Sequence, residues 1–157
     1  MAEDSLIPYT TDEGINYLIK FTVFSPEKLP EEINLPVIDI VIETDSAVHD
    51  INNDSKVLIQ ITKIISDYLK EEEAILYYYC SDREIKKSKR NKHLSHQEFR
   101  SKLFSAMFSL NKATDLINKL IVIDDPSRNN HYLHLIGDKK HESVINRIAD
   151  EAKKLDK

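Results

Sequence analysis

Ala74-Ile75-Leu76-Tyr77-Tyr78-Tyr79-Cys80 forms a nearly continuous apolar run in the middle of the sequence. The acidic triplet Glu71-Glu72-Glu73 precedes it, and a polar segment rich in lysine and arginine follows it. A short apolar run between charged flanks is typical of a central strand that is buried on both faces. The sequence therefore predicts that residues 74–80 form an interior strand of a sheet.

Two amphipathic helices are predicted around this run. Asp54 or Ser55 can cap a helix that continues to about Lys70. Its apolar stripe is Val57, Ile61, Ile64, Ile65 and Tyr68. Further along, Ser95-His96-Gln97-Glu98 is a capping box, with Leu94 and Phe99 at the staple positions. It predicts a helix from 96 to about 110 whose inward residues are Phe99, Leu103, Ala106, Met107 and Leu110.

The remaining segments predict further strands and a last helix. Residues 15–24 alternate as a strand does, and the turn signal Asp12-Glu13-Gly14 makes Ile7–Thr10 its hairpin partner. Val37–Glu43 reads as another strand, and residues 120–124 and 131–136 read as a second hairpin. A helix at about 141–155 would bury Ile145, Ile148, Ala149, Ala152 and Leu155.

This order of elements predicts an α+β fold, because strands and helices do not alternate strictly. We expect one mostly antiparallel sheet with about three helices packed on one face. Residues 57–68, 75–79 and 99–110 should then share one apolar interior. Residues 1–157 should form a single domain, with frayed termini at 1–6 and 153–157.

Composition narrows the class of protein. Hydrophobic residues make up 41% and charged residues 31% of the 157 residues, which is typical of a globular chain. The two glycines leave no phosphate-cradling Gly-rich loop, and the one cysteine suits a reducing compartment. No apolar stretch approaches the length of a membrane span, and the start Met1-Ala2-Glu3-Asp4 lacks the features of a signal peptide. We expect a cytoplasmic protein that binds no membrane and no cofactor.

The end of the predicted central strand is the first candidate site. Cys80 and Asp82 leave the strand there, and a cysteine nucleophile would need nearby cations and a base such as His93 or His96. The favoured alternative is a buried structural cysteine, because free cysteines are usually buried. Arg100 could extend from the helix edge, but a structural pair with Asp82 is favoured.

The basic segment is the second candidate site. Residues 83–92 carry a net charge of +5, so the rest of the chain carries −10. These cations could bind phosphates of nucleic acid or a nucleotide, or an acidic protein, although a solvated loop is the favoured reading. The candidate phosphate- or partner-binding residues are Arg83, Lys86, Lys87, Lys89, Arg90 and Arg100.

The predicted second hairpin carries two histidines. His131 and His134 should face opposite sides of a strand, and Asp124 or Asp125 could approach one of them. A metal site needs three or four converging ligands, so we predict no metal here. Asp39 and Glu43 share one strand face, which we expect to be exposed to solvent.

Several stretches together resemble a bacterial family typical of Bacteroidota, domain of unknown function family 6169. They are 9–17 leading into Phe21-Thr22-Val23-Phe24, Ile61–Ile65, Leu76–Cys80 with Asp82 after it, and Arg100-Ser101-Lys102-Leu103-Phe104. The chain departs from the family at Ser81, where an acid is usual, and at Met107-Phe108, where a Trp-Phe pair is usual. The resemblance spans about residues 9–136. It implies a small bacterial cytoplasmic protein and no particular reaction.

These observations favour a non-enzymatic protein-binding module of the immunity, antitoxin or accessory type. The acidic body of the chain could complement a basic partner. One alternative is phosphate binding through residues 83–100, and a second is an enzyme with its site at Cys80. No catalytic residue is assigned.

Overall fold

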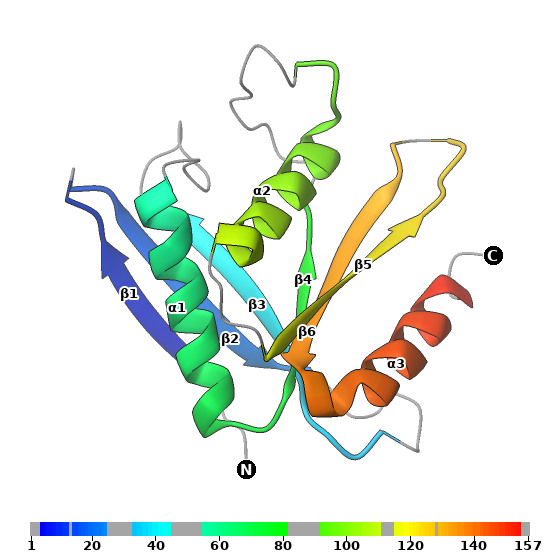
Figure 1. The fold of residues 1–157 in the computed structure, drawn as a ribbon. Helices are drawn as coiled ribbons and strands as arrows, with labels where there is room; N and C mark the ends of the chain where they lie inside the picture. The colour runs from blue at the N-terminus through cyan, green and yellow to red at the C-terminus, as the bar shows by residue number, and fades with distance from the viewer. Residues whose placement is uncertain are drawn as a thin grey trace.

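The computed structural model describes residues 4–12, 14–24, 33–44, 55–81, 92–110, 115–127 and 129–154. Within these residues one six-stranded sheet has the order β1-β2-β3-β4-β6-β5. Its strands are β1 (Ser5–Thr10), β2 (Asn16–Val23), β3 (Val37–Thr44), β4 (Ile75–Tyr79), β5 (Leu116–Ile123) and β6 (His131–Asp138). The helices are α1 (Ser55–Glu71), α2 (His96–Leu110) and α3 (Glu142–Lys154), with a short 3-10 turn, η3 (Lys139–His141), before α3 (Figure 1).

The sheet is mixed but mostly antiparallel, which confirms the predicted α+β fold. β1, β2 and β3 pair antiparallel, and so do β4, β6 and β5. The two halves meet at β3 and β4, which run parallel because α1 crosses over between them. β4 is thus an interior strand, as predicted. Ser5 and Leu6 pair with β2 and Lys153 lies in α3, so the frayed ends predicted at 1–6 and 153–157 are too long.

Helices α1 and α2 lie together on one face of the sheet (Figure 1). Ile61 and Ile65 of α1 meet Phe104 and Met107 of α2 in one core cluster, together with Leu76 of β4. The predicted shared interior of residues 57–68, 75–79 and 99–110 is therefore present. Both helices begin and end close to their predicted bounds.

Helix α3 covers the opposite face, so the prediction of all helices on one face is wrong. Ile145, Ile148 and Ala149 of α3 form a second core cluster with Val37, Ile75, Ile121, Leu133 and Leu135. The physical reason lies in β4, where Leu76 and Tyr78 point to the first cluster while Ile75 and Tyr77 point to the second. A strand that is apolar on both faces needs cover on both sides.

Helix α2 is fixed by its predicted cap and by a wider buried face than its apolar residues indicated. The Glu98 backbone N–H donates to Ser95 Oγ at 3.1 Å, and Leu94 and Phe99 are both buried. Arg100 and Ser101 are buried as well, at 2% and 3% exposure. The inward surface of this helix therefore includes polar side chains that need partners in the core.

Candidate functional site

The end of β4 places Cys80 in the core. Cys80 has no exposed surface, and its backbone N–H donates to the Tyr132 carbonyl of β6 at 3.0 Å. Burial raises the pKa of the Cys80 thiol to about 12, although the nearby Arg100 guanidinium lowers it in part. A thiol in this state is the opposite of an activated nucleophile. The geometry supports the structural reading of Cys80.

Arg100 reaches from α2 to the end of β4. Its Nη1 donates to the Ser81 carbonyl at 2.7 Å, which ties the helix to the strand end. The expected pair with Asp82 lies outside the described residues. So do Arg83, Lys86, Lys87, Lys89 and Arg90, and the phosphate-binding interpretation of this segment stays a prediction.

A cavity opens where β3 and β4 separate. The two strands pair only from Val37 with Ile75 to Asp39 with Tyr77. Beyond that point a cavity of about 300 Å³ is lined by Asp39, Ile40, Val41, Ile42, Glu43, Tyr78, Tyr79, Ser81 and Arg100. Burial raises the pKa of Asp39, and Glu43 pairs with Lys20 at 2.9 Å. The two acids predicted on a solvent face thus line a recess at the carboxyl ends of parallel strands, a common position for ligands.

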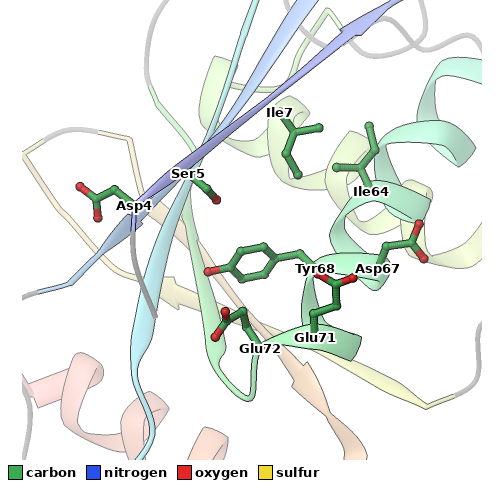
Figure 2. A pocket seen from close by; sticks show the side chains of 8 residues that line it. All are labelled: Asp4, Ser5, Ile7, Ile64, Asp67, Tyr68, Glu71 and Glu72. Carbon is green, nitrogen blue, oxygen red and sulfur yellow. The ribbon is translucent and has the colours of Figure 1, made fainter. Parts of the chain in front are cut away.

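A larger groove runs between β1 and the last turns of α1 (Figure 2). Its volume is about 500 Å³, and its lining residues are Asp4, Ser5, Ile7, Ile64, Asp67, Tyr68, Glu71 and Glu72. Four of these eight residues are acids and none is basic. The walls therefore combine two isoleucines and an aromatic ring with a concentration of negative charge.

The floor of this acidic groove holds two buried hydroxyl groups. Tyr68 stacks on Phe21 with 4.0 Å between ring centroids, which fixes its ring in the groove. Tyr68 Oη and Ser5 Oγ are buried and have no hydrogen-bond partner among the described residues. Burial and the charges of Glu72 and Asp4 raise the pKa of Tyr68. Because these two oxygens are closed off from solvent, the carboxylates are the acceptors that the groove presents to a cation with N–H donors.

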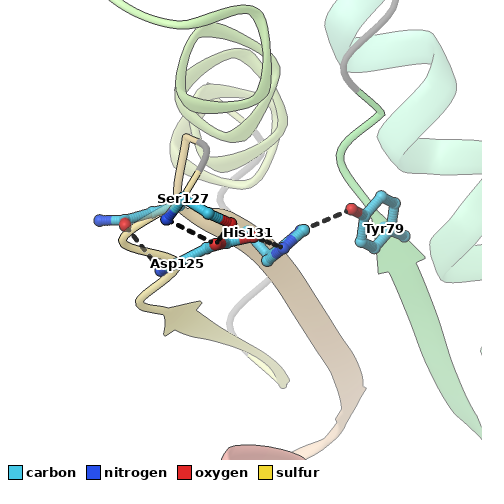
Figure 3. Close-up of polar contacts among 5 residues, drawn as sticks. Tyr79, Asp125, Ser127 and His131 are labelled. Carbon is cyan, nitrogen blue, oxygen red and sulfur yellow. Dashed lines mark hydrogen bonds and ion pairs between the residues drawn. The ribbon is translucent and has the colours of Figure 1, made fainter. Parts of the chain in front are cut away.

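A third group of polar side chains joins β4 to the turn between β5 and β6 (Figure 3). Tyr79 Oη lies 2.8 Å from His131 Nδ1, and His131 Nε2 lies 3.0 Å from Asp125 Oδ2. Hydrogen bonds from Ser127 and His131 lower the pKa of Asp125. This confirms that one histidine of the hairpin meets Asp125, and it adds Tyr79.

The other histidine, His134, faces the opposite side of β6 and is fully buried. Ser101 Oγ lies 2.8 Å from its Nε2, and Asn118 Oδ1 lies 2.8 Å from its Nδ1. Ser101, His134 and Asn118 thus follow one another as the nucleophile, the base and the residue that orients the base do in a catalytic triad. Ser101 is only 3% exposed and lines neither of the two cavities, so the series joins α2 to β6 and β5 as a core network.

The described part of the chain holds no group of three or more His, Cys, Asp or Glu side chains that could bind a metal. No described helix has the length and apolar character needed to cross a membrane. Comparisons with protein-family models, curated proteins and solved structures gave no match. The resemblance to family 6169 therefore stays a prediction.

The acidic groove was not predicted from the sequence, although one signal was present. Asp67 and Glu71 lie in the last turns of α1 and Glu72 follows directly, where acids oppose the helix dipole, while Lys70 is the basic residue of that last turn. Stability alone would favour basic residues at that position. The contribution of Asp4 and Ser5 could not be foreseen, because they meet the helix only through the pairing of β1 with β2.

Proposed function

We propose that this chain is a non-enzymatic binding module and that a basic segment of a partner protein docks in the acidic groove. The observation that carries the proposal is a groove of about 500 Å³ with four acidic and no basic lining residues. Opposite charge across an interface steers association and selects the partner.

The chemistry of the groove suits a lysine or arginine side chain. Such a side chain has an aliphatic stem that packs on apolar surface and a charged head that needs acceptors. In the groove, Ile7 and Ile64 offer apolar surface, and the carboxylates offer acceptors.

The charge distribution of the chain supports the same reading. Outside residues 83–92 the chain carries −10, so a basic partner is attracted over a distance and not only at the groove.

The test measures binding of a fluorescein-labelled lysine-rich peptide by anisotropy. We expect wild-type protein to bind it, with weaker binding at higher ionic strength. The variant Glu71→Gln/Glu72→Gln should bind about tenfold more weakly, as expected when two partly shielded ion pairs are lost. A matched control, Glu142→Gln/Asp150→Asn on α3, changes the net charge equally and should bind as the wild type does.

Two outcomes would contradict the proposal. Equal weakening by the groove variant and the α3 control would mean that only overall charge matters. No difference between the groove variant and the wild type would remove the groove from the interface. A pull-down from the native host should recover one basic protein from the wild type and lose it with the groove variant.

A further inference from the structure

Tyr79, His131 and Asp125 form a continuous hydrogen-bonded series at the upper end of β4 (Figure 3). The series lies apart from the acidic groove and shares no residue with it. Tyr79 is 40% exposed and lines the cavity between β3 and β4. A phenol that is accessible and also bonded to an imidazole differs from the buried tyrosines of this chain.

The positions of the hydrogens on Tyr79 and His131 follow from Asp125, the group at the end of the series that can only accept a hydrogen bond. Asp125 is an ionised carboxylate that only accepts, because the hydrogen bonds from Ser127 and His131 lower its pKa. In the neutral imidazole, His131 Nε2 therefore carries the hydrogen and donates to Asp125. Nδ1 is then the acceptor, and the Tyr79 hydroxyl donates to it. The imidazole is set to take the proton of Tyr79.

The carboxylate is held in place by its own turn. Ser127 donates to Asp125 Oδ1 from its backbone N–H at 3.1 Å and from its hydroxyl at 2.7 Å. The Asp125 backbone N–H donates to Asn130 Oδ1 at 3.2 Å. Asp125 is thus a fixed positioning residue for His131, as a nucleophile with a positioned base requires.

We propose that Tyr79 is an activated nucleophile that is acylated once by a neutral aryl ester, with His131 as its general base. Tyr79 Oη attacks the ester carbonyl carbon while its proton passes to His131 Nδ1. The new Oη–C bond forms, the bond from the carbonyl carbon to the aryloxy oxygen breaks, and the proton of His131 passes to that leaving oxygen. The products are an O-acyl tyrosine and a phenol, and nothing is oxidised or reduced.

The charges near Tyr79 determine the class of donor. The cavity that Tyr79 lines has two carboxylates, Asp39 and Glu43, and one guanidinium, Arg100. Asp125 adds a further negative charge behind His131. Lys20 pairs with Glu43 at 2.9 Å, so the two carboxylates are balanced by Lys20 and Arg100 and the cavity has no net charge to attract an ionic donor. An uncharged aryl ester therefore suits this cavity.

The experiment exposes the whole chain to p-nitrophenyl acetate and locates the acetyl group by peptide mass spectrometry. We expect Tyr79 to be acetylated at least about 100-fold faster than N-acetyltyrosinamide, because a positioned general base contributes about 100-fold or more. His131→Asn should reduce the rate to that of the free phenol. The matched control, His141→Asn at a histidine that contacts Glu73 next to the other end of β4, should leave it unchanged.

Further variants separate activation from a structural role. Tyr79→Phe should abolish the labelling at this peptide without loss of folding, because Tyr79 is exposed. Asp125→Asn should slow acetylation and Asp125→Glu should restore part of the rate, with circular dichroism unchanged. The proposal is overturned if Tyr79 reacts no faster than the free phenol, if His131→Asn reacts as the wild type does, or if the label lies on His131.

Discussion

His134 is held neutral inside the core between one donor and one acceptor. Burial lowers the pKa of His134 to about 4, well below the value of about 6.5 of an exposed histidine. With Nδ1 donating to Asn118, Nε2 can accept the Ser101 hydroxyl only while the ring is uncharged. Protonation of His134 therefore destabilises the folded state relative to the unfolded chain.

We predict that His134 makes the stability of the protein pH-dependent. Above about pH 6.5 His134 is neutral in both the folded and the unfolded chain, and its full contribution to the free energy of unfolding is present. As the pH falls from about 6.5 to about 4 only the unfolded chain takes up the proton, so the free energy of unfolding falls by about 3 kcal/mol. Urea unfolding across this range should show the loss. His134→Gln should remove that part of the pH dependence, and an unchanged slope would contradict the prediction.

Cys80 gives a second prediction about a single side chain. The thiolate is the reactive form, and a pKa of about 12 leaves little of it near neutral pH. We expect the native protein to react with Ellman's reagent at least about 100-fold more slowly than free cysteine, and to react fully once unfolded. Fast reaction of the folded chain would instead support the enzyme alternative at this strand end.

Helix α2 packs against α1 on one side and against strand β6 of the sheet on the other. It is capped by Ser95, tied to the end of β4 through Arg100 and tied to β6 through Ser101. These polar contacts lie at its start and along one face, where they fix both its first turn and its rotation. The cap is the contact that can be removed without disturbing the core.

We predict that Ser95→Ala lowers the free energy of unfolding by about 1 kcal/mol, the usual cost of losing an N-cap. Ser95→Asp should keep most of the stability, because a carboxylate also accepts the Glu98 N–H and favours the positive end of the helix dipole. Ser109→Ala, near the other end of the same helix and outside the cap, is the matched control. Equal effects of the substitutions at Ser95 and Ser109 would show that the cap contributes nothing specific.

At the scale of the whole molecule, the sequence predicted the elements better than their arrangement. Periodicity indicated which side of each helix is apolar, and α1, α2 and α3 were found near their predicted positions. It could not say which face of the sheet each helix covers. The apolar run at Ile75–Tyr79 did indicate that helices lie on both faces of the sheet, because a strand that is apolar on both faces must be buried on both.

The polar sites were harder to foresee for a physical reason. His134, Ser101 and Asn118 come from β6, α2 and β5, and Tyr79 and His131 are brought together only by the pairing of β4 with β6. No local pattern marks such contacts between distant segments. The pairing of His131 with Asp125 was predictable, because both belong to one hairpin.

The two core clusters share strands β3, β4 and β6, each of which supplies residues to both, so we predict that the clusters unfold together. β4 supplies Leu76 to the cluster under α1 and α2, and Ile75 to the cluster under α3. Losing either cluster would therefore expose one face of β4 and weaken the other cluster. Two matched substitutions test this, Ile61→Val in α1 and Ile145→Val in α3, each at a fully buried isoleucine.

Each substitution should lower the free energy of unfolding by about 1 kcal/mol, and the double variant should lose the sum because the sites belong to different clusters. In amide hydrogen exchange, the slowest amides of both α1 and α3 should lose protection by the same amount in each single variant. The pairing of β3 with β4 is the place where the molecule would divide if this were wrong, because it spans only three residue pairs. Loss of protection confined to α3 in Ile145→Val would show that the sheet does divide there.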